Sequence, residues 1–347
     1  MPGADRPPSP HRRRAWIVAL VILVAGLVAF ALSRLELSRV GNALINTKPG
    51  WIVLAVALMA SSLVVRSVSW HQVLRAALPG SRVPWAPVTR ATMIGVMGSA
   101  VFPGRLGEPA RVIVLSRRLE GSPRRVLPIV AGTAFSQTLM NLLALGVLAI
   151  VTFSAVPLGG GHATGIVIAL SIPLAIAVLV VTGPRIVAQG RRSRNKRVHA
   201  LADSMERLLR HARQGLTVFA RPRYGAVAVT TQLFAWALQW LACYTVLLAL
   251  GLQDETNLAT AAAILLAVNV SAVLPATPSN VGVFQAACLV VLAAYGVGAG
   301  KGLAYGILLQ AVEVVTALAL GVPALLREGV SWSDLRGAAS AGDESAQ

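Results

Sequence analysis

The sequence predicts an all-α fold, a polytopic bundle of membrane-spanning helices. Of its 347 residues, 56% are hydrophobic and 13% are charged, whereas soluble domains are roughly 45–50% apolar. Long apolar runs recur along the chain, as is typical of membrane spans. Pro and Gly interrupt two of these runs. This pattern predicts two re-entrant hairpins of broken helix beside about six full spans, arranged as an inverted repeat.

Charge and cysteine content narrow the classes of partner and chemistry. The formal net charge is +18, which in a soluble protein would point to nucleic acid. Here the basic residues cluster between apolar runs, so anionic lipid headgroups are the expected partners and nucleic acid is not. Cys243 and Cys288 both lie in apolar segments, and their number and spacing fit neither a disulfide framework nor a metal site. No cofactor is predicted.

The N-terminal region is predicted to be a disordered tail followed by a membrane-spanning anchor. Residues 1–14 are rich in Pro and basic residues, which predicts a disordered cytoplasmic tail. The apolar run 16–32 follows Arg12, Arg13 and Arg14. A signal peptide is the competing interpretation. An uncleaved span is favoured because the run is long for a signal peptide and further spans follow it.

The membrane domain is predicted to occupy residues 15–327, followed by a disordered tail at 328–347. Its interrupted runs are 88–115 and 258–297. The uninterrupted runs after the first span are 51–65 with an extension towards Trp70, 126–153, 163–182, 226–250 and 302–326. Each approaches or exceeds the length that crosses a bilayer.

Residues 184–224 form a basic loop between two spans. Within it, residues 198–219 place apolar side chains on one helical face, with Arg207, Arg210 and Arg213 beside them. This pattern fits an amphipathic helix lying on an anionic leaflet. It fits equally a solvated basic loop that only sets topology, and both interpretations stay open.

The distribution of basic residues predicts the orientation. If both broken runs return to the side they came from, only four Lys and Arg fall outside the cell, namely Arg34, Arg39, Lys48 and Lys301. By the positive-inside rule this favours cytoplasmic N- and C-termini in a multi-pass protein of the cell (plasma) membrane. The first hairpin then enters from the cytoplasmic side and the second from outside.

The first interruption carries the clearest candidate site. It contains Gly104, Arg105, Gly107, Glu108 and Arg111. A helix starting near Gly107 would bring Glu108 and Arg111 onto one face and aim its free N–H groups into the break. With Arg105 this predicts a phosphate-headgroup site. The alternative is that Glu108 only neutralises an arginine at a membrane turn.

The second interruption offers small polar groups. Thr277, Ser279 and Asn280 lie between prolines, and Gly282 permits close approach. An extracellular loop with helix caps is the alternative to a hairpin. Other polar residues within apolar runs are expected to form interhelical hydrogen bonds: Gln137, Asn141, Gln232, Gln239, Asn269, Gln285 and Gln310. Glu313 needs a partner such as Arg66 or Arg105, or a wet cavity, and is a candidate proton site.

Together the interruptions resemble the lysylphosphatidylglycerol synthase transmembrane region, a family of flippase-like integral membrane proteins. The motifs are residues 103–111 (PGRLGEPAR) and 275–287 (PATPSNVGVFQAA), and the resemblance covers roughly residues 15–327. It implies a protein that handles phospholipids or polyprenyl-linked lipids. In bifunctional members a separate soluble domain makes the aminoacyl lipid. This chain ends soon after its last span, so we expect no such domain and no enzyme activity.

The chain departs from the family pattern at several intramembrane charges. Relatives often carry a Glu-Arg pair and an Asp where this chain has Gln137, Thr138 and Asn141. Gln285 replaces a frequent acidic residue, and an Arg common in the last span is replaced near Gln310. These changes imply either a different substrate or the loss of proton coupling.

The resemblance and the residues lead to three functional hypotheses. The first is a flippase-like protein that binds and translocates an anionic phospholipid or a polyprenyl-phosphate-linked precursor through Gly104, Arg105, Gly107, Glu108 and Arg111. In it Thr277, Ser279, Asn280, Gly282, Gln285 and Glu313 are further substrate-binding candidates. The second is a non-transporting scaffold for envelope-biosynthesis enzymes. The third is a membrane enzyme whose polar residues converge only in three dimensions.

Overall fold

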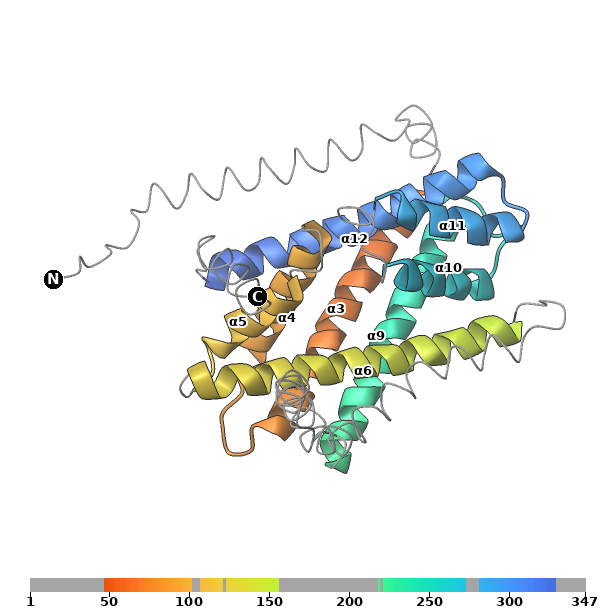
Figure 1. Cartoon of the computed structure of the whole chain (residues 1–347). Helices are drawn as coiled ribbons and strands as arrows, with labels where there is room; N and C mark the ends of the chain where they lie inside the picture. The colour runs from red at the N-terminus through yellow and green to blue at the C-terminus, as the bar shows by residue number, and fades with distance from the viewer. Residues whose placement is uncertain are drawn as a thin grey trace, which may run out of the picture.

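The structure, a computed structural model, describes residues 47–101, 107–120, 123–155, 218, 221–272 and 281–328, and the described residues fold into helices alone (Figure 1). This confirms the predicted all-α class. Two of the predicted spans, 16–32 and 163–182, lie outside the described residues. So do the N-terminal tail and nearly all of the predicted amphipathic helix at 198–219. Of the predicted tail 328–347, only Glu328 is described, and it is helical and buried rather than disordered.

Among the described residues, four long helices are apolar and long enough to cross a membrane. They are α3 (Pro49–Ala77), α6 (Pro123–Ala155), α9 (Pro222–Ala249) and α12 (Ala299–Glu328). Each matches a predicted span. Prolines at the first turns of α3 and α9 suit positions whose N–H groups have no intrahelical partner. Large apolar side chains such as Val53, Phe234 and Val315 face outward, as expected where lipid rather than water surrounds the bundle.

Helices α3 and α9 form the antiparallel centre of the bundle. The Lys48 amide, just before α3, donates to the Ala249 carbonyl at 3.2 Å. Near the opposite end, Ser69 Oγ donates to the Ala228 carbonyl at 2.8 Å. Helices α6 and α12 pack against this pair (Figure 1).

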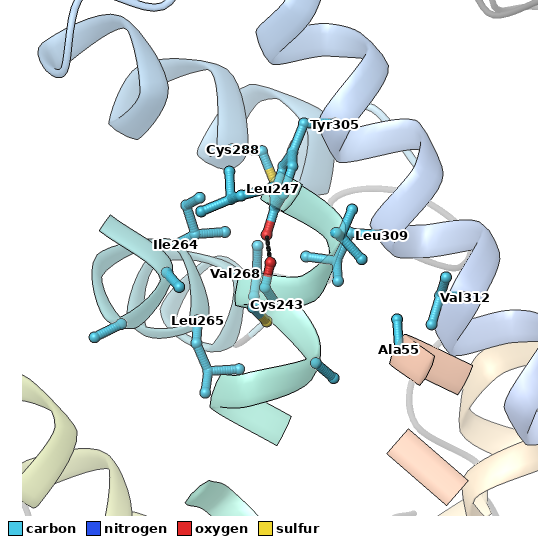
Figure 2. Packing of buried hydrophobic residues seen from close by; sticks show 14 of the residues in the cluster. Ala55, Cys243, Leu247, Ile264, Leu265, Val268, Cys288, Tyr305, Leu309 and Val312 are labelled. Carbon is cyan, nitrogen blue, oxygen red and sulfur yellow. Dashed lines mark hydrogen bonds between the residues drawn. The ribbon is translucent and has the colours of Figure 1, made fainter. Parts of the chain in front are cut away.

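A hydrophobic core among the described residues joins α9 to the C-terminal helices (Figure 2). The Tyr305 hydroxyl on α12 donates to the Cys243 carbonyl on α9 at 2.8 Å. Leu247, Ile264 and Leu309 are fully buried around this bond. Cys243 and Cys288 are buried here as free thiols.

Two pairs of shorter helices flank the long ones. Helix α4 (Trp85–Val101) packs on α5 (Gly107–Ser116), and α10 (Leu258–Ser271) packs on α11 (Val283–Ala294). The residues linking each pair, 102–106 and 273–280, lie outside the described ranges. Glycines allow these helices close contact with α12: Gly321 lies against Met97 of α4, and Gly306 against Gln285 of α11.

The two helix pairs begin at opposite ends of the bundle. At one end, Arg90 near the start of α4 and Arg118 just after α5 both bind Glu328, the last residue of α12. At the other end, Lys301 near the start of α12 pairs with Glu255 just before α10 at 2.9 Å. The α4–α5 pair therefore lies towards one end of the bundle and the α10–α11 pair towards the other (Figure 1).

Candidate functional site

Arg111 on α5 lies at the centre of the candidate site, with only 7% of its side chain exposed. Its Nη1 donates to Gln137 Oε1 on α6 at 2.8 Å. Its Nη2 forms an ion pair with Glu108, which is 52% exposed. The guanidinium carbon lies 4.7 Å from the centroid of the Trp70 ring, in cation–π geometry. Its buried Nε has no hydrogen-bond partner among the described residues.

Glycines allow α5, which carries Arg111, to pack closely against α4. A Cβ on Gly95 of α4 would lie 2.9 Å from the Arg111 Cβ, and one on Gly98 would lie 2.9 Å from the Gly107 Cα. Side chains at these positions would hold α5 away from α4. The helix start predicted near Gly107 is confirmed, with Glu108 in the first turn.

A second arginine, Arg66 on α3, lies in the same hydrogen-bonded network. Its Nη2 donates to Gln239 Oε1 on α9 at 3.1 Å, and its carbonyl accepts from Gln137 Nε2 at 3.3 Å. Gln137 therefore touches both arginine residues. The Arg66 Nε is also buried without a hydrogen-bond partner in the described part of the chain.

The polar network continues one helical turn further along α6. Gln232 Nε2 and Trp236 Nε1 on α9 both donate to Asn141 Oδ1, at 2.5 and 3.3 Å. These contacts confirm the predicted interhelical roles of Asn141 and Gln232. Asn269 differs, because its Nδ2 donates to the Leu265 carbonyl of its own helix at 2.8 Å.

Apart from Glu313, the predicted site residues fall into three groups. Gly107, Glu108 and Arg111 lie together. Gly282 and Gln285 lie in the second helix pair, where Gln285 Oε1 accepts from the Gly282 amide at 2.6 Å and Gln285 Nε2 donates to Gln310 Oε1 on α12. The third group lies outside the described residues: Gly104, Arg105, Thr277, Ser279 and Asn280.

Glu313 is half-buried on α12. Its expected pairing with Arg66 or Arg105 stays a prediction. The role of Trp70 was not predicted. Its spacing of four residues from Arg66, one helical turn, was the available signal.

Gln285 caps α11 and ties it to α12, so we expect Gln285→Leu to lower stability. The change removes the acceptor of the Gly282 amide and the donor to Gln310. Losing two such bonds should cost about 1–3 kcal/mol. Thermal unfolding in detergent measures the loss, with Gln253→Leu at an exposed position as the control. Equal melting temperatures for the two variants would contradict the capping role.

The carboxylate of Glu328, which was not among the predicted site residues, is buried at one end of the bundle. The Glu328 side chain is 1% exposed and binds Arg90 Nε and Arg118 Nε, the latter at 2.6 Å. Arg118 Nη2 also donates to the Glu328 carbonyl at 2.7 Å. Glu328 therefore fixes both members of the α4–α5 pair, and with them Arg111, to α12.

Comparison with known proteins agrees with this architecture. The chain is similar to a protein named glycosyltransferase AglD from Haloferax volcanii, with 29% identity over 353 residues. The similarity covers 92% of this chain and 55% of the relative, so the chain spans little more than half of the relative's length. The family model described as lysylphosphatidylglycerol synthase TM region matches residues 16–321. Since that match takes in most of the sequence, this integral membrane protein belongs to the lysylphosphatidylglycerol synthase transmembrane-region family.

Proposed function

We propose that this protein binds an anionic lipid headgroup and translocates the lipid across the cell membrane. The lipid is a phospholipid or a polyprenyl-phosphate-linked precursor. One observation carries the proposal: two arginines, Arg66 and Arg111, each keep a buried Nε without a partner among the described residues. A buried unsatisfied donor is costly, by about 1–3 kcal/mol, and phosphate oxygens would satisfy both.

The contacts of Arg111 would allow a bound phosphate to take the place of the Glu108 carboxylate. Gln137 and Trp70 hold the guanidinium from inside the bundle, whereas its ionic partner Glu108 is half exposed. A phosphate can therefore replace the Glu108 carboxylate without unpacking the core. An arginine fork binds phosphate with two parallel hydrogen bonds, and the N-terminus of α5 adds a favourable dipole.

The helix pairs give a route for the lipid. In this proposal α4–α5 is a re-entrant hairpin from the cytoplasmic side and α10–α11 is one from outside, related as an inverted repeat. The opposite ends at which the pairs begin support this arrangement. Basic residues at the α4–α5 end agree with cytoplasmic termini.

Lipid movement in reconstituted vesicles tests the proposal. The full chain would be placed in liposomes with headgroup-labelled anionic lipids, and outer-leaflet label would be quenched over time. We expect Arg111→Gln to slow movement about tenfold or more, because a charge-assisted bond is worth roughly 1.5–3 kcal/mol. Arg75→Gln, which removes the same charge at an exposed position, should change the rate less than twofold. Unchanged movement in Arg111→Gln would rule out this site.

The similarity to a longer protein named as a glycosyltransferase favours one second candidate. This chain would then be a non-transporting membrane scaffold for enzymes of envelope lipid or glycan synthesis. The basic residues within 185–223 would be the docking face. Co-purification of such an enzyme, lost on deletion of 185–223, together with inactivity in vesicles, would favour the scaffold over the translocase.

A further inference from the structure

We propose that Ser62 and Arg66 form a second anion-binding position on α3, apart from Arg111. The anion accepts hydrogen bonds from the Ser62 hydroxyl and from the Arg66 Nε–H group. An inorganic anion and the phosphate of a membrane lipid both have this chemistry. Where the anion is a lipid phosphate, the inference rests on the proposed function, and it adds Ser62, which binding of phosphate at Arg111 does not use.

Ser62 on α3 is 1% exposed, and its hydroxyl oxygen is buried without a hydrogen-bond partner in the described ranges. A buried serine in a helix can donate to a carbonyl of the preceding turn. Ser67 does so, to the Val64 carbonyl at 2.7 Å. The Ser62 hydroxyl does not, so its donor is available to a group outside α3.

Arg66, one helical turn further along α3, also lacks a partner. Its Nη2 donates to Gln239 Oε1 at 3.1 Å, but its buried Nε has no acceptor in this part of the chain. Arg111 pairs with Glu108, whereas Arg66 forms no ion pair with a carboxylate of the described residues. A charged side chain within a span is costly without a counter-ion. An anion would supply both the missing acceptor and the missing charge.

Two contacts fix the register between the antiparallel helices α3 and α9. Ser69 donates to the Ala228 carbonyl, and the Lys48 amide donates to the Ala249 carbonyl. These contacts are 21 residues apart on each helix, so one step back along α3 matches one step forward along α9. Gln239 is eleven residues after Ala228 and therefore lies opposite position 58, eleven residues before Ser69.

This register places the two unpaired groups beside one another. Position 58 is eight residues from Arg66, about 12 Å along the helix axis, and the Arg66 and Gln239 side chains must span that length to bond. Helical side chains lean towards the N-terminus of their own helix. In an antiparallel pair these two therefore lean towards each other and meet halfway, at the level of Ser62. Ser62 and Arg66 also share one face of α3, since they are four residues apart.

The proposed position is separate from that of Arg111. The guanidinium of Arg111 lies over the ring of Trp70, which is four residues beyond Arg66, whereas Ser62 is four residues before it. Gln137 links the two arginines through the Arg66 carbonyl rather than through the Arg66 guanidinium. The two arginines therefore offer their unpaired N–H groups at different levels of the bundle.

A water molecule is the alternative occupant, because it too can bond a hydroxyl and an N–H group. Arginine N–H is only a donor, and a serine hydroxyl can donate, so a pure acceptor satisfies both. Only an anion also balances the charge of Arg66. The observations therefore favour an anion over water.

Anion-dependent stability of the full chain in detergent tests the inference. Thermal unfolding would be followed while sodium chloride or sodium phosphate replaces sodium gluconate at constant ionic strength. In a second arm, phosphatidylglycerol would replace phosphatidylcholine in mixed micelles. A ligand that binds only the folded state raises the melting temperature. We expect Ser62→Ala to weaken the stabilising anion about tenfold or more, the weight of a hydrogen bond to a charged group.

Two further variants sharpen the test. Ser61→Ala, which removes the hydroxyl of the exposed neighbouring serine, should leave the anion dependence unchanged. Arg66→Lys keeps the charge but removes the Nε–H group, and should weaken the anion as Ser62→Ala does. A Ser62-dependent shift with chloride or phosphate identifies an inorganic anion, and one seen only with phosphatidylglycerol identifies a lipid phosphate. Equal anion dependence of Ser62→Ala and the wild type in both arms would overturn the inference and leave water as the occupant.

Arg111→Gln separates this inference from the proposed function. Lipid movement that does not depend on Arg111, with the Ser62 effect on inorganic anions intact, would remove the proposed function alone. Absence of any Ser62 effect, with lipid movement still dependent on Arg111, would remove only the second anion position.

Discussion

Replacing Gly107 with alanine is expected to prevent stable folding of the α4–α5 pair. A Cβ at this position would overlap the Gly95 carbonyl oxygen and lie 2.5 Å from both the amide nitrogen and the Oγ of Ser99. Backbone atoms cannot move aside as a flexible side chain can. The cost should reach or exceed the upper end of the about 1–3 kcal/mol typical of overpacking, and Arg111 would be displaced with α5.

Gly300→Ala is the matched control for this experiment, because a Cβ there meets nothing within 4 Å. The yield of monodisperse protein and its melting temperature in detergent would be measured for both variants. We expect a severe loss for Gly107→Ala and none for Gly300→Ala. A wild-type melting temperature in Gly107→Ala would show that α4 and α5 do not pack as closely as described.

Replacing Glu328 with alanine is expected to release α4 and α5 from the end of α12. The change removes the shared partner of Arg90 and Arg118, whose side chains are 30% and 46% exposed. Charge-assisted bonds contribute roughly 1.5–3 kcal/mol each. Because both arginines can regain water, we expect a combined loss of about 2–3 kcal/mol rather than the full sum.

The exposed pair between Lys301 and Glu255 provides the comparison. Glu255→Ala removes a carboxylate from an ion pair at the opposite end of the bundle, where such pairs contribute about 0–1 kcal/mol. Thermal unfolding should therefore separate the two glutamate variants clearly. If Glu328→Ala and Glu255→Ala lower the stability by the same amount, the carboxylate of Glu328 does not hold α4–α5 to α12.

Local patterns in the sequence anticipated much of the first helix pair. The start of α5 near Gly107 and the pairing of Glu108 with Arg111 depend on residues at most four positions apart. Helix geometry alone brings residues three apart together. The apolar runs likewise predicted α3, α6, α9 and α12, because length and composition decide whether a helix can cross a bilayer.

The partners of the arginines could not be predicted in this way. Arg111 reaches Gln137 26 residues away, and Arg66 reaches Gln239 173 residues away. Glutamines in apolar runs need hydrogen-bond partners, so the sequence predicted that they form interhelical hydrogen bonds. Which partner each one finds depends on how the helices cross. Glu328 was missed for the same reason, since its arginines lie 210 and 238 residues away.

By itself, the sequence determined the membrane class, the long spans and the local chemistry of the first interruption, because hydrophobic length and helical spacing act over short stretches of chain. Only the tertiary structure decided that Arg66 joins Arg111, that neutral glutamines hold both, and that Glu328 fixes α5 to α12. The position of Arg111 depends on the close approach of α5 to α4 at Gly95 and Gly107. Packing of that kind depends on the whole arrangement of helices, which no single stretch of sequence contains.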